Sequence, residues 1–77
     1  MTEGDRHLDL RGLLCPLPVL KSRKALRDMV PGACLTVDAT DEMTVIDIPH
    51  FCREDGHLLE EQHQLDGGIL RFVIRKG

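Results

Sequence analysis

Four segments of the chain alternate polar and apolar residues with the period of a half-buried β-strand. They are residues 7–10, 34–39, 57–65 and 69–75. Between the last two, Asp66 is followed by Gly67 and Gly68, which is typical of a hairpin turn. In the final segment Leu70, Phe72 and Ile74 fall on one face, and we expect this face to lie in the core.

A helical period of apolar residues follows each of the first two segments. Pro16 suits the first position of a helix and Pro31-Gly32 would end it, so one helix is predicted over residues 16–30. The residues that share its predicted core face are Val19, Ser22, Leu26, Met29 and Val30.

A second helix is predicted to begin at a cap formed by Thr40 or Asp41 and to run to Glu54. Its inward residues would be Val45, Ile48 and Cys52. Pro49 lacks an N–H group and should either kink this helix or mark a restart capped by Asp47. The order β-α-β-α-β-β favours an α+β fold, a two-layer sandwich with a mixed four-stranded sheet and two helices on one face.

Length limits what this fold can hold. Residues 1–77 are expected to form a single domain with one core layer. A deep substrate cavity would empty that core, which excludes an enzyme that encloses a large substrate.

Charge is distributed unevenly along a chain whose net charge is −3. Residues 16–30 carry four basic side chains against Asp28 alone, whereas residues 38–66 carry nine acids against Arg53 alone. Such asymmetry can orient a partner protein. The chain has two Phe and no Trp or Tyr to stack on bases, so direct nucleic-acid binding is not expected.

The three cysteines are an odd number, and no apolar run precedes them near the N-terminus. No segment is long and apolar enough to suggest a membrane span. We therefore expect a cytoplasmic protein whose cysteines are reduced.

Cys15 stands at the predicted N-cap of the first helix, framed by Gly12, Pro16 and Pro18. A helix N-terminus has unpaired N–H groups and partial positive charge, which favour a thiolate. Because neither proline has an N–H group, the amide of Leu17 would be the one that can donate to the sulfur. We expect an exposed, rigidly directed sulfur with a lowered pKa.

This arrangement suits sulfur transfer better than hydrolysis. A nucleophilic cysteine in a hydrolase normally needs a positioned base, and no spacing assigns His7, His50, His57 or His63 to Cys15. A persulfide ionises more readily than a thiol and passes its outer sulfur to another thiolate, as in disulfide exchange. The competing interpretation is a buried, inert cysteine, because cysteine is often buried and proline is common at a helix start.

Three motifs carry a resemblance to a known family. Residues 12–18, Gly-Leu-Leu-Cys-Pro-Leu-Pro, resemble the Cys-Pro-x-Pro motif of the TusA-like (SirA-like) sulfur carriers. Residues 47–52, Asp-Ile-Pro-His-Phe-Cys, resemble that family's Asp-Ile-Pro-x-Phe-Cys segment, and residues 71–77 resemble its Ile-Arg-Lys-Gly ending. The similarity covers nearly the whole chain, and the predicted element order matches the family's two-layer sandwich.

The resemblance implies that Cys15 carries sulfur as a covalent persulfide and that no other cofactor is needed. Members receive sulfur from a cysteine desulfurase or rhodanese-like donor and pass it to an acceptor sulfurtransferase protein in tRNA thiolation, sulfur oxidation or cofactor synthesis. The residues that would position the sulfur are Gly12, Pro16 and Pro18. Leu17 stands where the best-known tRNA-thiolation members have an acid, and Glu42 stands where they have a proline after the aspartate. The first of these differences lies beside the sulfur and therefore concerns the choice of partner.

Two leucines fall on the charged side of the first helix. Leu17 and Leu20 lie one turn apart beside Cys15, and basic residues surround them. These basic residues are Lys21, Arg23, Lys24 and Arg27. We expect this surface to dock a partner protein, on a chain that is a monomer while it hands on its sulfur.

The other cysteines have simpler interpretations. Cys52 should pack in the core, and Cys34 should point to the uncovered side of the sheet with no activating neighbour. A metal site formed by Cys52, His57 and His63 matches no known ligand spacing, so no metal is expected.

Two other classes of function stay open. A non-catalytic interaction module, regulatory or RNA-binding, could use the same small sandwich, although the acidic balance argues against RNA. A thiol redox relay would need a resolving cysteine near Cys15, and the chain has no Cys-x-x-Cys.

Overall fold

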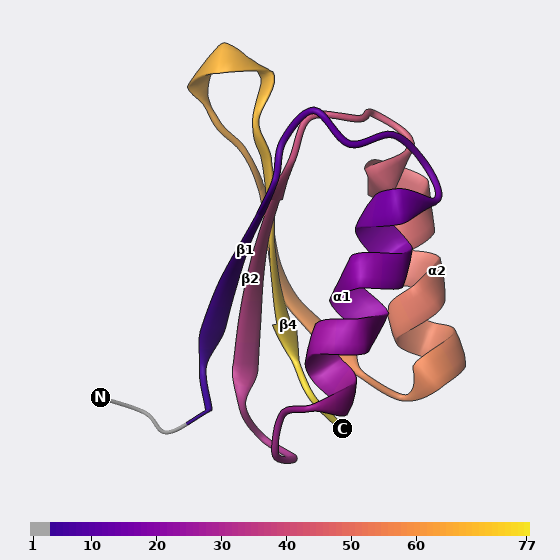
Figure 1. Ribbon diagram of the computed structural model, residues 1–77. Helices are drawn as coiled ribbons and strands as arrows, with labels where there is room; N and C mark the ends of the chain where they lie inside the picture. The colour runs from indigo at the N-terminus through magenta and orange to yellow at the C-terminus, as the bar shows by residue number, and fades with distance from the viewer. Residues whose placement is uncertain (1–3) are drawn as a thin grey trace.

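The computed structural model describes residues 4–77, in which two helices pack on one face of a four-stranded sheet (Figure 1). The strands are β1 (Arg6–Leu10), β2 (Cys34–Ala39), β3 (Leu58–Gln64) and β4 (Leu70–Arg75). The helices are α1 (Leu17–Arg27) and α2 (Thr44–Asp55), and a short 3-10 turn, Asp66–Gly68, joins β3 to β4. The predicted element order and the α+β sandwich are confirmed. Residues 1–3 of the expected single domain lie outside the described residues.

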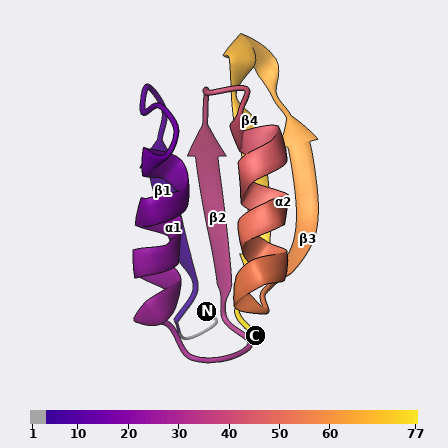
Figure 2. The same cartoon turned by 90° about the vertical axis from the view of Figure 1, so that its right-hand side faces the viewer.

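The sheet has the strand order β1-β2-β4-β3. β1 pairs with β2 in parallel, and the other two pairings are antiparallel. Figure 2 shows α1 and α2 lying side by side over the sheet. Because β1 and β2 are parallel, the loops that follow them meet at the same end of the sheet, the upper end in Figure 1. This end brings the segment that contains Cys15 close to the start of α2.

The core lies between the sheet and the helices. Its fully buried side chains from the strands include Leu35, Val37, Phe72 and Ile74. Those from the helices include Leu26, Ile48, Phe51 and Cys52. The face of β4 predicted to be buried is therefore confirmed. Within residues 4–77, neither helix combines the length and the apolar character needed to cross a membrane.

Two predicted core residues are exposed instead. Val30 is 59% exposed because α1 ends at Arg27, so the helical period does not extend to it. Val45 is 42% exposed because it lies in the first turn of α2, over an open hollow that it lines with Gln62 and Leu70. The core face of α2 begins at Ile48 instead.

The start of α2 also differs from the prediction. The helix begins at Thr44 rather than directly after Thr40 or Asp41. Asp41 nonetheless organises this start, since its Oδ1 accepts a hydrogen bond from the Met43 N–H (3.0 Å) and its carbonyl accepts one from the Thr44 N–H (3.0 Å).

Pro49 lies inside α2 without ending or restarting it, so the prediction of a restart capped by Asp47 is wrong. Proline lacks the N–H that would bond to the carbonyl four residues earlier. That carbonyl belongs to Val45 in the exposed first turn, where water can bond to it. The helix therefore tolerates the proline at this position.

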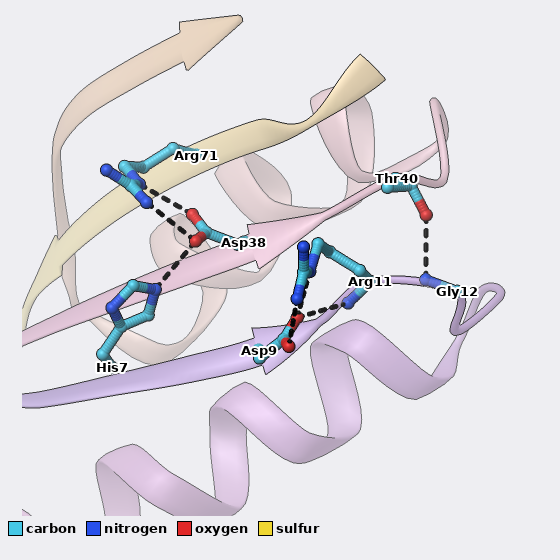
Figure 3. A network of polar contacts seen from close by, with 7 residues as sticks. All are labelled: His7, Asp9, Arg11, Gly12, Asp38, Thr40 and Arg71. Carbon is cyan, nitrogen blue, oxygen red and sulfur yellow. Dashed lines mark hydrogen bonds and ion pairs between the residues drawn. The ribbon is translucent and has the colours of Figure 1, made fainter. Parts of the chain in front are cut away.

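The face of the sheet away from the helices carries a polar network (Figure 3). The carboxylate of Asp38, a residue that is 7% exposed, accepts hydrogen bonds from Arg71 Nε (2.7 Å) and Nη2 (2.9 Å). His7 Nε2 lies 2.8 Å from the same carboxylate. The hydrogen bonds from Arg71 are the main reason that the pKa of Asp38 is lowered. This network joins β1, β2 and β4 across the uncovered face.

Asp38→Asn should lower the free energy of unfolding by about 1 kcal/mol at neutral pH, because it leaves the partly exposed Arg71 without its charged partner. Because the folded-state pKa of Asp38 lies below its unfolded value, this stabilisation is complete above the unfolded pKa. It is lost as the pH falls through the folded pKa, so the difference between the two proteins should narrow in acid. Urea denaturation at several pH values measures this.

Asp9→Asn is the matched control, because Asp9 pairs with Arg11 in an ion pair that is exposed on both sides. It should cause a smaller loss of stability than Asp38→Asn. Equal losses in the two variants, or a loss in Asp38→Asn that does not change with pH, would contradict the account of this network.

Candidate functional site

Cys15 lies in the loop between β1 and α1. The chain turns after β1 at Gly12, whose φ of +83° falls in the left-handed region that favours glycine. The Gly12 N–H donates to Thr40 Oγ1 (2.9 Å), and Figure 3 shows this contact at the end of β2. The turn at Gly12 therefore fixes the Cys15 loop against the segment that leads into α2.

Cys15 precedes the N-cap of α1 and does not form it, so the predicted capping position is wrong. The first helical hydrogen bond runs from the Leu20 N–H to the carbonyl of Pro16 (3.1 Å), which makes Pro16 the N-cap. The Leu17 N–H, predicted to bond to the sulfur, donates to the carbonyl of Leu14 instead (2.9 Å). The partner of the sulfur comes from another element.

That partner is Asp47 in the first turn of α2. Cys15 Sγ donates a hydrogen bond to Asp47 Oδ2 (2.9 Å). The Cys15 N–H donates to Asp41 Oδ2 (2.6 Å), so two carboxylates hold the residue from the same side. The thiol is thus tied to α2 and not to the amide end of α1.

These contacts reverse the expected electrostatics of Cys15. The hydrogen bond to Asp47 is the largest cause that raises the pKa of the thiol, and desolvation and the charges of Asp47 and Asp41 add to it. The expectation of a lowered pKa is wrong, because a carboxylate in contact with the sulfur outweighs the partial charge of a helix end. The raised pKa favours the protonated thiol of Cys15 over the thiolate near neutral pH.

Cys15 opens onto a shallow hollow of about 350 Å³ between α1 and α2. The charged or titratable side chains that line it besides Cys15 are Arg23, Asp47, His50 and Glu54. The guanidinium of Arg23 is engaged by Asp55 on α2 (Nε to Oδ2, 2.7 Å), and His50 Nε2 lies 3.6 Å from Glu54 Oε1. The hollow is open to solvent and lies beside the sulfur.

The leucines predicted to form a docking surface lie outside the core. Leu17 is 43% exposed and Leu20 is 50% exposed, and three basic neighbours on α1 are also exposed. These neighbours are Lys21, Lys24 and Arg27. Arg23 differs from them in being half-buried and turned toward α2. Its Cζ lies 5.3 Å from the centre of the Phe51 ring.

Further exposed apolar side chains, which no sequence pattern indicated, occur in the segments around Cys15. Leu14 is 69% exposed, Ile46 is 64% exposed and Met43 is 48% exposed. Leu14 and Ile46 directly precede Cys15 and Asp47 in the chain. No period marked these residues as surface positions, because they lie in loops or at the first turn of a helix.

The other two cysteines lie in different environments. Cys52 is 1% exposed, and its burial raises the pKa of its thiol to about 11. Cys34 is half-buried at the start of β2, the opposite end of the sheet from Cys15, with its Sγ 3.7 Å from Glu60 Oε1. Burial is the main cause that raises the pKa of Cys34. Of the three cysteines, Cys15 is the exposed one.

The remaining predicted site residues keep their places in the Cys15 loop. Pro16 is exposed and forms the N-cap, whereas Pro18, the second residue of α1, is buried against the core. In the part of the chain that the structure describes, no three His, Cys, Asp or Glu side chains are grouped so that they could hold a metal ion.

Asp41 and Asp47 are the site residues that sequence reasoning missed. Both lie far from Cys15 along the chain and reach it only because parallel β1 and β2 end at the same edge. A signal for Asp47 was available, since it opens the second motif, at residues 47–52. The sequence alone suggests Asp47 only as the possible cap of a helix restart at Pro49, and not as a contact of Cys15.

Comparisons with known proteins agree along almost the whole chain. The family model described as "Sulfurtransferase TusA" matches residues 6–76. The sulfur carrier protein TusA of Allochromatium vinosum is 41% identical over 76 residues, which cover 99% of each chain. The sulfur carrier protein TusA of Pseudomonas paraeruginosa is 44% identical over 72 residues, which cover 94% of this chain and 91% of that one.

A solved structure gives the same result for the fold. The SirA-like protein from Desulfitobacterium hafniense superposes with a TM-score of 0.84 at 25% sequence identity. The superposition covers 94% of this chain and 97% of that one.

Proposed function

The chain belongs to the TusA family of sulfurtransferases, and from this premise we propose that Cys15 carries sulfur as a persulfide from a donor protein to an acceptor protein. The observation that supports this most is the placement of Cys15 as the exposed cysteine, in a loop fixed by Gly12 and Asp41. The sulfur is held in one direction and can be reached by a partner's cysteine.

The transfer needs no redox cofactor. The Cys15 thiolate attacks the outer sulfur of a donor persulfide, so that a new S–S bond forms and the donor leaves as its own thiolate. The outer sulfur keeps its oxidation state, and the proton of the Cys15 thiol is released. An acceptor thiolate then repeats the same displacement on loaded Cys15. The protein is consumed and regenerated in each cycle, so it is both a transferase and a protein substrate.

The donor that we propose is a cysteine desulfurase or a rhodanese-like protein, and the acceptor is a sulfurtransferase protein in tRNA thiolation or sulfur oxidation. The hollow beside Cys15 is open and small, which favours thiol groups on protein loops over a large enclosed substrate. We place the exchange in the cytoplasm, between a monomeric carrier and one partner at a time, without direct contact to nucleic acid.

Loading of the purified protein tests this proposal. After incubation with a cysteine desulfurase and cysteine, without reductant, the intact mass should rise by about 32 Da, one sulfur atom per chain. The same mixture without cysteine should leave the mass unchanged. If neither a desulfurase nor a rhodanese with thiosulfate produces this gain, the non-catalytic interaction module becomes the better account.

Leu20→Glu should slow loading by a donor protein about fivefold, because it places a charge in the apolar part of the surface that would dock the donor. Its fold should be unchanged, since Leu20 is half exposed and contributes little to the core. Intact-mass spectrometry of samples quenched at successive times, at low donor concentration, measures the loading rate.

Val30→Glu is the control for this variant. Val30 is also an exposed apolar residue, at 59%, but it lies beyond the other end of α1 from Cys15. Loading of Val30→Glu should match the wild-type rate. Identical rates in Leu20→Glu and Val30→Glu would remove the docking surface on α1 from the account.

A further inference from the structure

We propose that Asp47 biases this transfer toward release of the sulfur, because it stabilises unloaded Cys15 and repels its persulfide. The inference rests on the proposed function and concerns the direction in which sulfur moves. It is carried by the contact between the reacting atom, Cys15 Sγ, and Asp47 Oδ2 at 2.9 Å.

The backbone that carries this carboxylate is fixed by the helix. Asp47 lies in the first turn of α2, where the Asp47 N–H donates to the carbonyl of Met43 (2.9 Å) and the helix end favours an anion. Asp41 anchors the facing backbone through the Cys15 N–H. The backbones on both sides of this contact are therefore fixed by hydrogen bonds, and the two side chains face each other across it.

The charged groups around the sulfur come from α1, from α2 and from the loop before α2. Asp47 and Asp41 approach it from α2 and from the loop before α2. From α1, Arg23 lines the same hollow, but Asp55 engages its guanidinium. His50 and Glu54 also line the hollow from α2, and they contact each other. The groups in direct contact with Cys15 are thus negative, and no basic side chain among the described residues neutralises them at the sulfur.

The two states of Cys15 meet this carboxylate differently. The unloaded thiol keeps its proton and donates a hydrogen bond to the Asp47 carboxylate. In the loaded state Sγ has no proton, and the outer sulfur, about 2 Å further out, carries a negative charge near neutral pH. The hydrogen bond is then lost and two anions lie side by side. The difference favours the unloaded carrier.

Delivery follows from this difference. In the delivery step, the Cys15 persulfide anion (Cys15–S–S⁻) reacts with an acceptor thiol to give Cys15–SH and acceptor–S–S⁻. One S–S bond breaks and one forms. The proton of the acceptor thiol ends on Sγ, where Asp47 accepts its hydrogen bond. Asp47 therefore assists the step that empties the carrier and opposes the step that fills it.

The experiment measures the loading equilibrium of wild type and Asp47→Asn. Each protein is equilibrated near neutral pH with a fixed ratio of glutathione persulfide to glutathione, alkylated, and weighed intact. The ratio of loaded to unloaded protein should rise about fivefold in Asp47→Asn, which is the order expected for one exposed charge contact. The midpoint pH for alkylation of unloaded Cys15 should also fall in this variant.

Glu54→Gln is the matched control, because Glu54 lines the same hollow but contacts His50 and not the sulfur. Its loading ratio should stay within about twofold of wild type. Asp47→Ser serves as a second variant if Asp47→Asn fails to fold, and it should shift the ratio in the same direction. If wild type takes up sulfur but the folded Asp47 variant has a loading ratio no higher than that of wild type, this inference alone is overturned. If wild type takes up no sulfur at all, the proposed function fails, and this inference fails with it.

Discussion

Leu26→Ala should lower the free energy of unfolding by about 3 kcal/mol, the cost of removing a fully buried leucine from a core. Leu26 is 0% exposed and packs between α1 and the sheet. Domains of this size have a total stability near the lower end of about 5–15 kcal/mol, so this loss should leave a measurable unfolded fraction at physiological temperature. Urea denaturation followed by circular dichroism measures the change.

Leu20→Ala provides the matched control on the same helix. The substitution is chemically identical, and leucine and alanine are both good helix formers, so only the environment differs. Leu20 is 50% exposed, and its variant should differ from wild type by less than about 0.5 kcal/mol. Similar losses of stability in Leu26→Ala and Leu20→Ala would mean that α1 does not pack on the sheet through the face that contains Leu26.

Cys15→Ser should remove essentially all transferable sulfur from the protein. Wild type loaded by a desulfurase and freed of donor should yield about one thiocyanate per chain when treated with cyanide, which takes the outer sulfur of a persulfide. Serine has no sulfur to carry, but its hydroxyl can still donate to Asp47, so the fold should be kept. Thiocyanate is measured by its coloured iron complex.

Cys34→Ser is the control for this result. Cys34 is half-buried at the far end of the sheet and its thiol has a raised pKa, so it should take up little sulfur. The yield from Cys34→Ser should equal that of wild type. A substantial yield from Cys15→Ser, or a halved yield from Cys34→Ser, would show that the sulfur is shared between sites.

The fold was predictable because each element depends on local patterns. The alternation in residues 34–39 matched β2 residue for residue, since a strand with one buried face repeats every second residue. The face of Leu70, Phe72 and Ile74 followed in the same way. The predicted core residues that are exposed lie at helix ends. Val30 and Val45 continue the apolar period beyond the part of each helix that covers the sheet. A period alone does not show where packing stops.

The site was predictable only in part. The position and exposure of Cys15 followed from the glycine and prolines around it, which are adjacent in the chain. The electrostatic environment of its sulfur did not, because that environment is set by Asp47, 32 residues away. The helix end of α1 predicts a lowered pKa for the Cys15 thiol, whereas its contact with Asp47 raises that pKa. Charges brought close by the sheet topology outweigh those that the local sequence supplies.

The location of the extra sulfur is the most direct test of the whole account. Trypsin should release Cys15 alone in residues 12–21, whereas residues 28–53 contain both Cys34 and Cys52. After loading, alkylation and digestion without reductant, tandem mass spectrometry should find the added sulfur on Cys15 in residues 12–21. Added sulfur on residues 28–53, with residues 12–21 carrying only the alkyl group, would contradict the assignment of Cys15 as the carrier.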